Sequence, residues 1–346
     1  MRPDQWETLQ KCASGADLDS LPVALIVDSP WIPGYLQMST LDYLTLPDVW
    51  LQANLRVLQD FPEIIFIPGF WIEYGMAAEP SGFGCRVSTL GDKTPLVQTL
   101  GADFQMVEQL KVPDPRCDGL MPVLLNWYRH AQPRIEDAGY VVKIVAARGP
   151  LATATHLFGV TDFLLNLKLQ PELTHRLLEK TTRLAIDWLQ AQAEVLHSPG
   201  GILLLDDIVG FLSPKDYLEF GHPYLEKIFS AFPDAMKIFH NDMSNPVSYP
   251  HLESLGVNIF NFTHLIDLGR ARELVGQKIV LMGNIPPLDV LARGTQQQVL
   301  DSVVACRRAH PGRKGWILSA GGGVSPGTPW ENVRALITAA KSKEQA

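Results

Sequence analysis

Short apolar runs recur along the chain and alternate with longer segments in which apolar residues return at threes and fours. The runs are continuously apolar, which is typical of strands covered on both faces in a parallel sheet. We predict strands at residues 23–27, 64–67, 141–145, 202–205, 236–239, 257–260, 279–282 and 317–319. Helices are predicted at residues 172–196, 216–232, 297–310 and 329–343. This α/β alternation favours a single domain over residues 1–346, a (β/α)8 TIM-type barrel.

Two parts of the chain fall outside this alternation. An N-terminal extension precedes the first strand, and residues 69–140, rich in glycine and proline, form a long insertion after the second strand. An open doubly wound sheet is the alternative topology, because the same alternation of strands and helices builds it.

Composition narrows the class of protein. The 346 residues are 46% hydrophobic, and the net charge of −8 argues against nucleic-acid binding, which needs clustered Lys and Arg. No apolar run approaches the roughly 20 residues that span a bilayer, and the first residues lack the apolar core of a secretory signal. The cysteines form no CxxC pair: Cys12, Cys85, Cys117 and Cys306. We expect a cytoplasmic enzyme that acts on a small molecule, with no nucleic-acid or membrane partner.

Polar residues follow most of the predicted strands, where barrel enzymes place their active sites. In chain order they are Asp28, Trp71, Glu73, Arg148, Asp206, Asp207, His240, Asp242, Asn261, His264, Asn284 and the glycines at 321–323. Three of the polar side chains are candidates for substrate contacts: Arg148, Asn261 and Asn284.

The last strand opens directly onto three glycines, and Gly322 at their centre is a further candidate for contact with a ligand. Glycine lets the backbone approach a ligand closely, although a tight turn without a ligand is the alternative. Trp31 and Trp71 flank predicted strand ends and could wall a pocket, whereas most of the other aromatic residues belong to the core.

His240 and Asp242 follow the strand predicted at 236–239. Side chains two residues apart on an extended chain share a face, so the imidazole and the carboxylate could converge on one atom. This pair suits zinc or a similar divalent metal. The alternative is an aspartate that orients the histidine or closes a turn.

Asp206 and Asp207 follow another apolar strand. We expect one of them to position substrate or to pair with Arg148, with Asp206 the stronger candidate. The alternative is that the second aspartate only caps the next segment. His156 is a candidate acid–base group, because imidazole titrates near neutral pH, and a structural histidine is the alternative.

The glycine-rich insertion contains further candidate metal ligands. Glu79 and Cys85, near Glu73, could join His240 in a metal site. A lone cysteine is more commonly a small buried hydrophobic residue, and that is the alternative for Cys85.

Four segments of the chain resemble the uroporphyrinogen decarboxylase superfamily. They are residues 212–225 (LSPKDYLEFGHPYL), 239–242 (FHND), 282–291 (MGNIPPLDVL) and 316–332 (WILSAGGGVSPGTPWEN). The resemblance covers most of the chain after residue 141. It implies a (β/α)8 barrel, in agreement with the strand pattern, and a possible homodimer.

The decarboxylases of this superfamily have an arginine-rich N-terminal segment, an Asp after the second strand, a Tyr after the next strand and a His in the glycine loop. In this chain residues 28–35 contain no arginine, and Pro68, His156 and Gly322 stand at the other three positions. A substrate with several carboxylates needs cationic partners. The resemblance therefore does not favour uroporphyrinogen decarboxylation as the activity of this chain.

The chain is more similar to the corrinoid-dependent methyltransferases and demethylases. These bind zinc through a His-x-Cys pair and a Cys in the glycine loop; here His240 is kept, while Asp242 and Gly322 replace the cysteines. The resemblance implies methyl transfer between a small methoxy, methylamine or methylthio compound and a separate corrinoid-binding protein. A decarboxylase of tetrapyrrole metabolism and a non-catalytic ligand-binding barrel are the alternatives.

Overall fold

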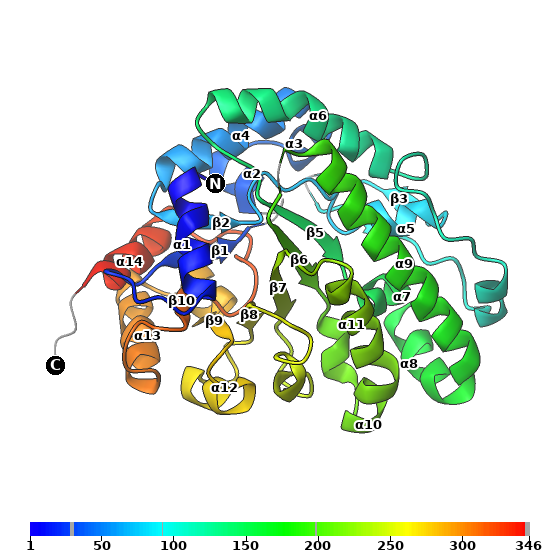
Figure 1. Cartoon of the computed structure of the whole chain (residues 1–346). Coiled ribbons are helices and arrows are strands. Elements are labelled where there is room, and N and C mark those ends of the chain that lie inside the picture. Colours follow the sequence, from blue (N-terminus) through cyan, green and yellow to red (C-terminus); the bar gives the residue numbers. More distant parts are fainter. Residues whose placement is uncertain (28–30, 92, 198, 343–346) are drawn as a thin grey trace.

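Eight parallel strands form the centre of the protein (Figure 1). The structure, a computed structural model, describes residues 1–27, 31–91, 93–197 and 199–342. The strands are β1 (Val23–Ile26), β2 (Ile64–Ile67), β5 (Ile144–Arg148), β6 (Gly201–Leu205), β7 (Met236–Asn241), β8 (Ile259–Phe262), β9 (Val280–Ile285) and β10 (Trp316–Ala320).

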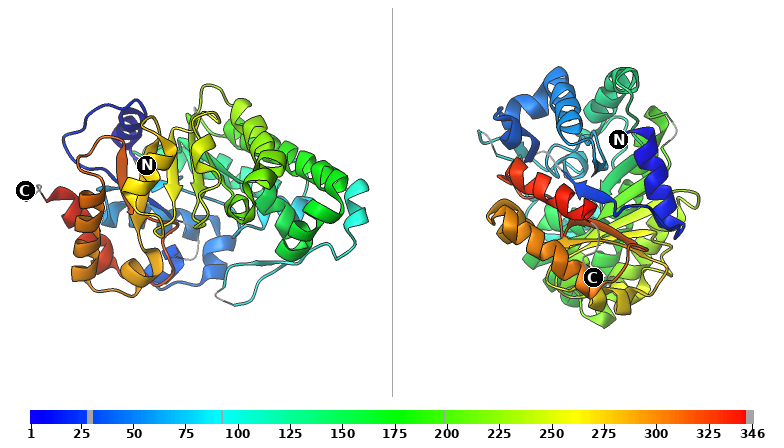
Figure 2. Two further views of the ribbon diagram at one scale, coloured as in Figure 1. Left: turned by 90° about the horizontal axis from the view of Figure 1, so that it is seen from below. Right: turned by 90° about the vertical axis from the view of Figure 1, so that its left-hand side faces the viewer.

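The strands pair in the order β2-β1-β10-β9-β8-β7-β6-β5 and form a nearly closed barrel surrounded by helices (Figure 2). Successive barrel strands pair with each other, except that β2 and β5 lie at the two ends of this order. The order shows no reversal of the kind that defines a doubly wound sheet. The prediction of a (β/α)8 barrel is confirmed, and the alternative of an open sheet is wrong.

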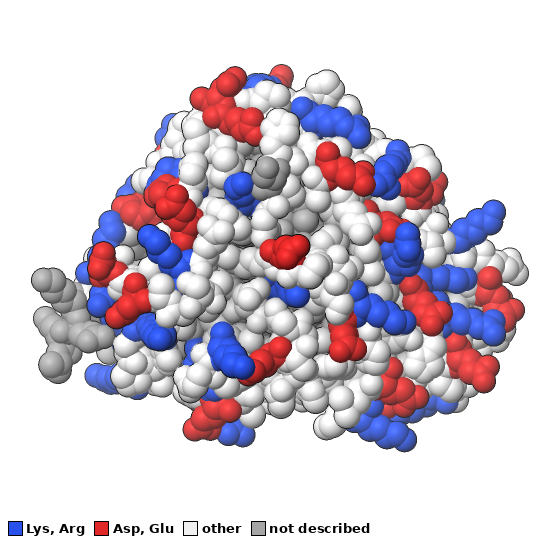
Figure 3. Space-filling model, viewed as in Figure 1, with Lys and Arg blue, Asp and Glu red and all other residues white. Residues whose placement is uncertain are grey.

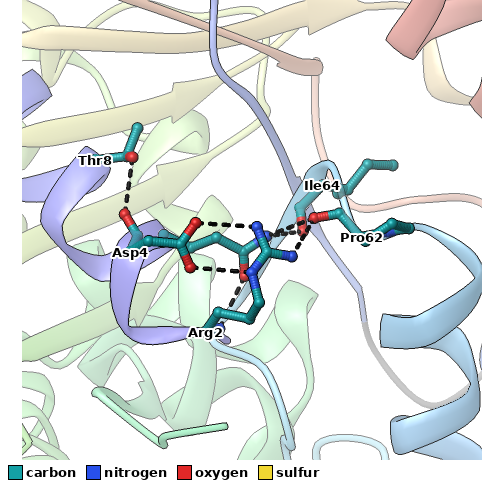
Figure 4. Close-up of polar contacts among 6 residues, drawn as sticks. Arg2, Asp4, Thr8, Pro62 and Ile64 are labelled. Atoms are coloured by element: carbon teal, nitrogen blue, oxygen red, sulfur yellow. Dashed lines mark hydrogen bonds and ion pairs between the residues drawn. The ribbon is translucent and has the colours of Figure 1, made fainter. Parts of the chain in front are cut away.

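The first residues of the chain bridge the end strands β2 and β5, and Figure 4 shows the contacts at Pro62 and Ile64. The side-chain amide of Gln5 donates to the carbonyls of Pro62 and Ile64 at 3.1 and 2.9 Å. The backbone amide of Val141 donates to the carbonyl of Met1 at 2.8 Å. Because Val141 bonds to the extension, β5 begins three residues later than predicted and ends at Arg148.

Helix α1 (Pro3–Ala13) packs across the N-terminal ends of the strands (Figure 1). Its Trp6 lies so close to the start of β6 that a Cβ on Gly200 would come within 2.7 Å of the indole ring. Trp6 and Leu9 belong to the same apolar cluster as the barrel interior. The N-terminal extension therefore covers one end of the barrel and leaves the carboxyl ends of the strands as the place for a site.

Side chains alternate along each strand between the barrel interior and the surrounding helices. The interior cluster contains alternate residues of the strands, including Ala24, Ile26, Ile65, Ile67, Ile144, Ala146, Leu203, Leu205, Ile238, Ile259, Val280, Met282 and Ile317. Counting by twos along β5, β6, β7, β8 and β10, the next inward positions toward the carboxyl ends are Arg148, Asp207, His240, Asn261 and Ser319. The barrel interior is thus apolar, and a polar layer lies next to it at the carboxyl ends of the strands.

Helices follow the strands around the barrel. They are α2 (Trp31–Leu36), α3 (Thr40–Thr45), α4 (Pro47–Asp60), α5 (Ala78–Gly82), α6 (Met121–Asp137), α7 (Pro150–Phe158), α8 (Val160–Leu169), α9 (Pro171–Val195), α10 (Pro214–Asp216), α11 (His222–Ser230), α12 (Leu268–Val275), α13 (Gln296–Ala309) and α14 (Trp330–Lys341). The predicted helices at 172–196, 297–310 and 329–343 correspond to α9, α13 and α14, although residue 343 lies outside the described residues. No helix in the described part of the chain is both long and apolar enough to cross a membrane.

One predicted helix is interrupted. Residues 216–232 were expected to be continuous, but a π-helical turn, η3 (Tyr217–Gly221), separates α10 from α11. The amide of His222 donates to the carbonyl of Tyr217, five residues earlier. Gly221 and Pro223 both weaken an α-helix interior, and the proline lies in the first turn of the new helix, where its missing N–H costs little.

The predicted insertion after β2 is confirmed and runs outside the barrel. It contains α5, the hairpin β3 (Val87–Ser88) and β4 (Leu96–Val97), the short helix η1 (Phe104–Glu108) and α6. Lys180 of α9 holds η1 by donating to the carbonyls of Val107 and Leu110 at 2.5 and 2.6 Å. On the face of the molecule covered by α1, acidic and basic side chains are interspersed (Figure 3).

Candidate functional site

His240, at the carboxyl end of β7, is held in one tautomer by Asn261 of β8. Its Nδ1 lies 2.7 Å from Oδ1 of Asn261. The amide nitrogen of Asn261 donates to the carbonyls of Met282 and Ala320 at 2.8 and 3.0 Å, so its Oδ1 is the acceptor and Nδ1 of His240 the donor. In the neutral imidazole Nε2 then carries the free lone pair, which is the form that binds a metal.

Two carboxylates lie beside this imidazole. Ligand atoms of Asp207, His240 and Asp242 all lie within 4.8 Å of one another. Nε2 of His240 is 3.5 Å from Oδ1 of Asp207, and the same oxygen accepts a hydrogen bond of 3.0 Å from the Asp242 amide. The convergence of His240 and Asp242 expected from their spacing is present, with Asp207 as a third member.

The two carboxylates are not balanced by a basic side chain of the described residues: no Lys or Arg there forms a salt bridge with either. Burial raises the pKa of Asp242, and the neighbouring Asp207 raises it further, while His240 and His264 act in the opposite direction. A divalent cation would relieve this repulsion. One imidazole nitrogen and two carboxylates are a donor set that fits Zn²⁺ and related divalent metals.

Glycines 321 and 322 form the neighbouring wall of the cluster. A Cβ on Gly322, whose φ is +132°, would lie 2.8 Å from Oδ2 of Asp242, and one on Gly321 would lie 2.5 Å from the backbone nitrogen of His264. The glycine segment therefore allows close approach of the backbone to Asp242. Contact of Gly322 with a substrate stays a prediction.

The adjacent aspartates have roles opposite to the expected ones. Asp206 is fully buried and accepts hydrogen bonds from the amides of Leu151 and Ala152 at 2.9 and 3.1 Å, so it caps α7. Burial raises the pKa of Asp206 to about 7, although these amides act against the shift. Asp207, the weaker of the two candidates, is the one that reaches His240. Counting by twos from Leu203 and Leu205 identifies Asp207 as inward-facing, a signal present in the sequence.

Arg148 lies on another part of the mouth and pairs with Glu73 rather than with Asp206. Its guanidinium donates to both carboxylate oxygens of Glu73, at 2.8 and 2.7 Å, and lies 5.3 Å from the centre of the Trp71 ring. The two charged side chains are 11% and 9% exposed. This region is therefore a buried ion pair against an aromatic wall.

The other candidates from the insertion do not join the metal-capable cluster. Glu79 is buried and accepts a hydrogen bond of 2.9 Å from the Arg148 amide; burial raises its pKa to about 7. Burial also raises the pKa of the Cys85 thiol to about 11, and Cys85 is not a member of the cluster. The expected set of His240, Asp242, Glu79 and Cys85 is replaced by one in which Asp207 is the third member.

The uroporphyrinogen decarboxylase (URO-D) family model matches residues 7–343 of the chain. The chain belongs to this family. A uroporphyrinogen decarboxylase of Thermus thermophilus is 29% identical over 266 residues, which is 74% of each chain. That of Microcystis aeruginosa is 25% identical and covers 91% of this chain and 98% of its own.

Two solved structures share the fold. A methyltransferase from Methanosarcina mazei has a TM-score of 0.77 at 19% identity and covers 96% of both chains. A B12-independent methionine synthase from Shewanella sp. W3-18-1, in complex with selenomethionine, has a TM-score of 0.56 at 12% identity and covers 93% of this chain. At these identities the likeness shows the fold alone.

Several candidates of this URO-D family member have partners within the fold. Trp31 is buried: its indole donates to the Thr328 carbonyl at 3.0 Å and stacks on Tyr35. Asn284 donates to the carbonyls of Ile266 and Thr263, at 2.6 and 3.3 Å, and so holds the turn after β8. These contacts give both side chains a role within the fold, and their contact with a substrate stays a prediction.

His156 and Asp28 are two further polar candidates from the sequence. His156, on α7, is half-buried, and burial together with the charge of Arg148 lowers its pKa to about 4. It is therefore neutral at neutral pH. Asp28 lies outside the described residues.

Proposed function

We propose that this protein is a metal-dependent methyltransferase or demethylase, which moves a methyl group between a small methoxy, methylamine or methylthio compound and a corrinoid protein. One observation carries the proposal: two neighbouring carboxylates and a tautomer-fixed imidazole converge at the barrel mouth without a basic side chain among the described residues to balance them. Such a cluster attracts a cation.

In this proposal Asp207, His240 and Asp242 hold a divalent cation, zinc by our expectation. When bound, the cation supplies Lewis-acid polarisation of the heteroatom from which the methyl group departs. Asn261 keeps Nε2 of His240 directed at the site, since its own amide is fixed by two backbone carbonyls.

The positions at which the family resemblance expects zinc-binding cysteines also support the proposal. These are positions 242 and 322, and the structure brings them into contact, because a Cβ at 322 would lie 2.8 Å from the Asp242 carboxylate. An aspartate at one position and a glycine at the other give an oxygen-rich site in place of a thiolate site. Asp207, which lies just after β6, is then the replacement ligand.

A separate corrinoid protein needs a surface on which to dock. Large apolar side chains are exposed on segments that follow β6, β8, β9 and β10, at the same end of the barrel as the cluster: Phe211, Leu218, Leu265, Leu288 and Trp330. Exposed apolar side chains at this end of the barrel would suit contact with another protein.

Decarboxylation is the second candidate, because the curated relatives at 29% and 25% identity are uroporphyrinogen decarboxylases. The charge of the mouth argues against it. Two carboxylates lie at the polar cluster, and Arg148 is already paired with Glu73, so a substrate with several carboxylates would meet repulsion.

Methyl transfer to free cob(I)alamin tests the proposal. The zinc-loaded protein is supplied with methoxy, methylamine and methylthio compounds, and methylcobalamin formation is followed by absorbance. We expect turnover with one class of donor and loss of at least roughly 100-fold in His240→Ala, while His197→Ala, at an exposed histidine, behaves as wild type.

Two other results would favour the alternatives. Conversion of uroporphyrinogen to coproporphyrinogen by the same preparation, without methyl transfer, would establish the decarboxylase. Failure of both reactions, combined with ligand binding that survives replacement of His240 and Asp242, would favour the non-catalytic barrel.

A further inference from the structure

A second histidine lies close to the metal-capable cluster but outside it. His264 follows β8, and its imidazole is near enough to Asp242 to lower the pKa of that carboxylate. It does not belong to the group whose ligand atoms lie within 4.8 Å of one another. His264 is therefore beside the cluster and separate from the three-residue donor set.

The backbone around His264 is fixed from two sides. The Asn284 side chain donates to the carbonyls of Thr263 and Ile266, on either side of His264, at 3.3 and 2.6 Å. The Leu265 amide donates to the Thr263 hydroxyl at 3.2 Å. The imidazole is thus presented by a rigid turn.

The glycine segment links this turn to the cluster. A Cβ on Gly321 would lie 2.5 Å from the backbone nitrogen of His264. A Cβ on the next residue, Gly322, would lie 2.8 Å from Oδ2 of Asp242. Side chains at these positions would clash with the histidine backbone and with the aspartate. The two glycines therefore let the backbone pack closely against both residues.

The ring of His264 has an unsatisfied nitrogen. Nδ1 is buried and has no hydrogen-bond partner among the described residues. A buried polar atom without a partner is costly, and in native structures such an atom commonly marks a place filled by water or ligand. A ligand bound beside this turn would supply the missing partner.

We propose that His264 is a substrate-binding residue, which donates a hydrogen bond to the heteroatom of a small methyl donor, or of its demethylated product, held beside Asp242. This inference rests on the proposed function, since the cation at Asp207, His240 and Asp242 would face the same heteroatom from the other side. The site would then select compounds whose heteroatom accepts a hydrogen bond while it faces the cation.

Cobalt-loaded protein tests this role without measuring turnover. Methanethiol, the demethylated form of a simple methylthio compound, is titrated into Co²⁺-loaded protein, and its binding is read from the visible absorption bands. We expect His264→Ala to keep the Co²⁺ affinity within about threefold of wild type and to weaken methanethiol binding by roughly tenfold or more, since a hydrogen bond to a charged group is lost.

Matched variants complete the test. His264→Gln keeps a side-chain donor and is expected to bind methanethiol within about threefold of wild type. His264→Leu, of more similar volume, serves in place of the alanine variant if that variant unfolds. His197→Ala removes an exposed imidazole and serves as the control. It is expected to bind methanethiol as wild type does.

Three results would overturn the inference. Unchanged methanethiol affinity in His264→Ala and His264→Leu would exclude the contact. A fall in Co²⁺ affinity as large as that in His240→Ala would make His264 a metal ligand instead. A wild-type protein that binds no Co²⁺ would overturn the metal site and this role together, whereas the first two results leave the metal site intact.

Discussion

Two regions at the carboxyl ends of the strands contain acidic side chains beside a basic or imidazole side chain. They differ in whether a cationic side chain neutralises the carboxylates. Around β5, Glu73 and Arg148 neutralise each other in a buried pair. Around β6 and β7, Asp207 and Asp242 lie side by side with His240 and form no salt bridge to Lys or Arg of the described residues. The charges of the first region are balanced within the chain, whereas a cation from outside would balance those of the second.

This difference assigns different functions to residues of similar type. A buried pair that is already satisfied holds loops in place and contributes to stability. A cluster of like charges costs stability, and proteins retain such clusters where a ligand supplies the missing charge. Substitutions in the two regions should therefore be separable, with loss of stability in one and loss of ligand affinity in the other.

Removing Glu73 should have the largest effect on stability. Glu73→Ala leaves the Arg148 guanidinium buried without its carboxylate, and we expect the free energy of unfolding to fall by about 3–5 kcal/mol in denaturant titrations. Glu63→Ala removes the acid of an exposed pair with Lys341 and should cost no more than about 1 kcal/mol. Equal losses in the two variants would show that the Glu73–Arg148 pair is not a stabilising buried pair.

The adjacent aspartates allow a stricter comparison. Asp206→Ala leaves two α7 amides without an acceptor and should cost about 2–3 kcal/mol. Asp207→Ala removes one hydrogen bond but also relieves repulsion with Asp242, so its cost should be within about 1 kcal/mol in metal-free protein. The reverse order of the two losses, measured by denaturant unfolding, would contradict the assignment of cap and ligand.

The sequence allowed the barrel to be predicted because its strands are continuous apolar runs, but it left the site partly undetermined. The Asp206 and Asp207 pair could have been resolved by counting inward positions along β6. Glu73 could not have been matched to Arg148, since the two are separated by the insertion and only the closed fold brings them together. The partners of Asn284 are backbone carbonyls of a turn, which no residue pattern reveals.

Asn261 should affect metal affinity through His240. Asn261→Ala removes the acceptor that fixes Nδ1, and the loss of such a supporting hydrogen bond typically weakens metal binding by about 10–100-fold. Asn284→Ala, at a buried amide of the next strand, should change metal affinity by less than about threefold. Competition with a chromophoric chelator, at a temperature where both variants are folded, measures the two metal affinities. Equal metal affinities of Asn261→Ala and Asn284→Ala would contradict the supporting role of Asn261.

His156 should affect stability only in acid. Burial lowers its pKa from 6.5 to about 4, so the unfolded chain binds more protons than the folded one between these values. The contribution of neutral His156 to stability is thus present above pH 6.5 and lost as the pH falls toward 4. His156→Gln should lose less stability than wild type over that interval, and parallel curves of stability against pH would contradict the shift.

Divalent metal binding by the purified protein tests the central claim most directly. Metal-free protein titrated with Zn²⁺ or Co²⁺ by calorimetry should bind one equivalent per chain, and His240→Ala and Asp242→Asn should abolish this binding while Glu79→Gln and Cys85→Ser retain it. Wild-type protein that binds no metal, or variants at His240 and Asp242 that bind the metal as wild type does, would contradict the account.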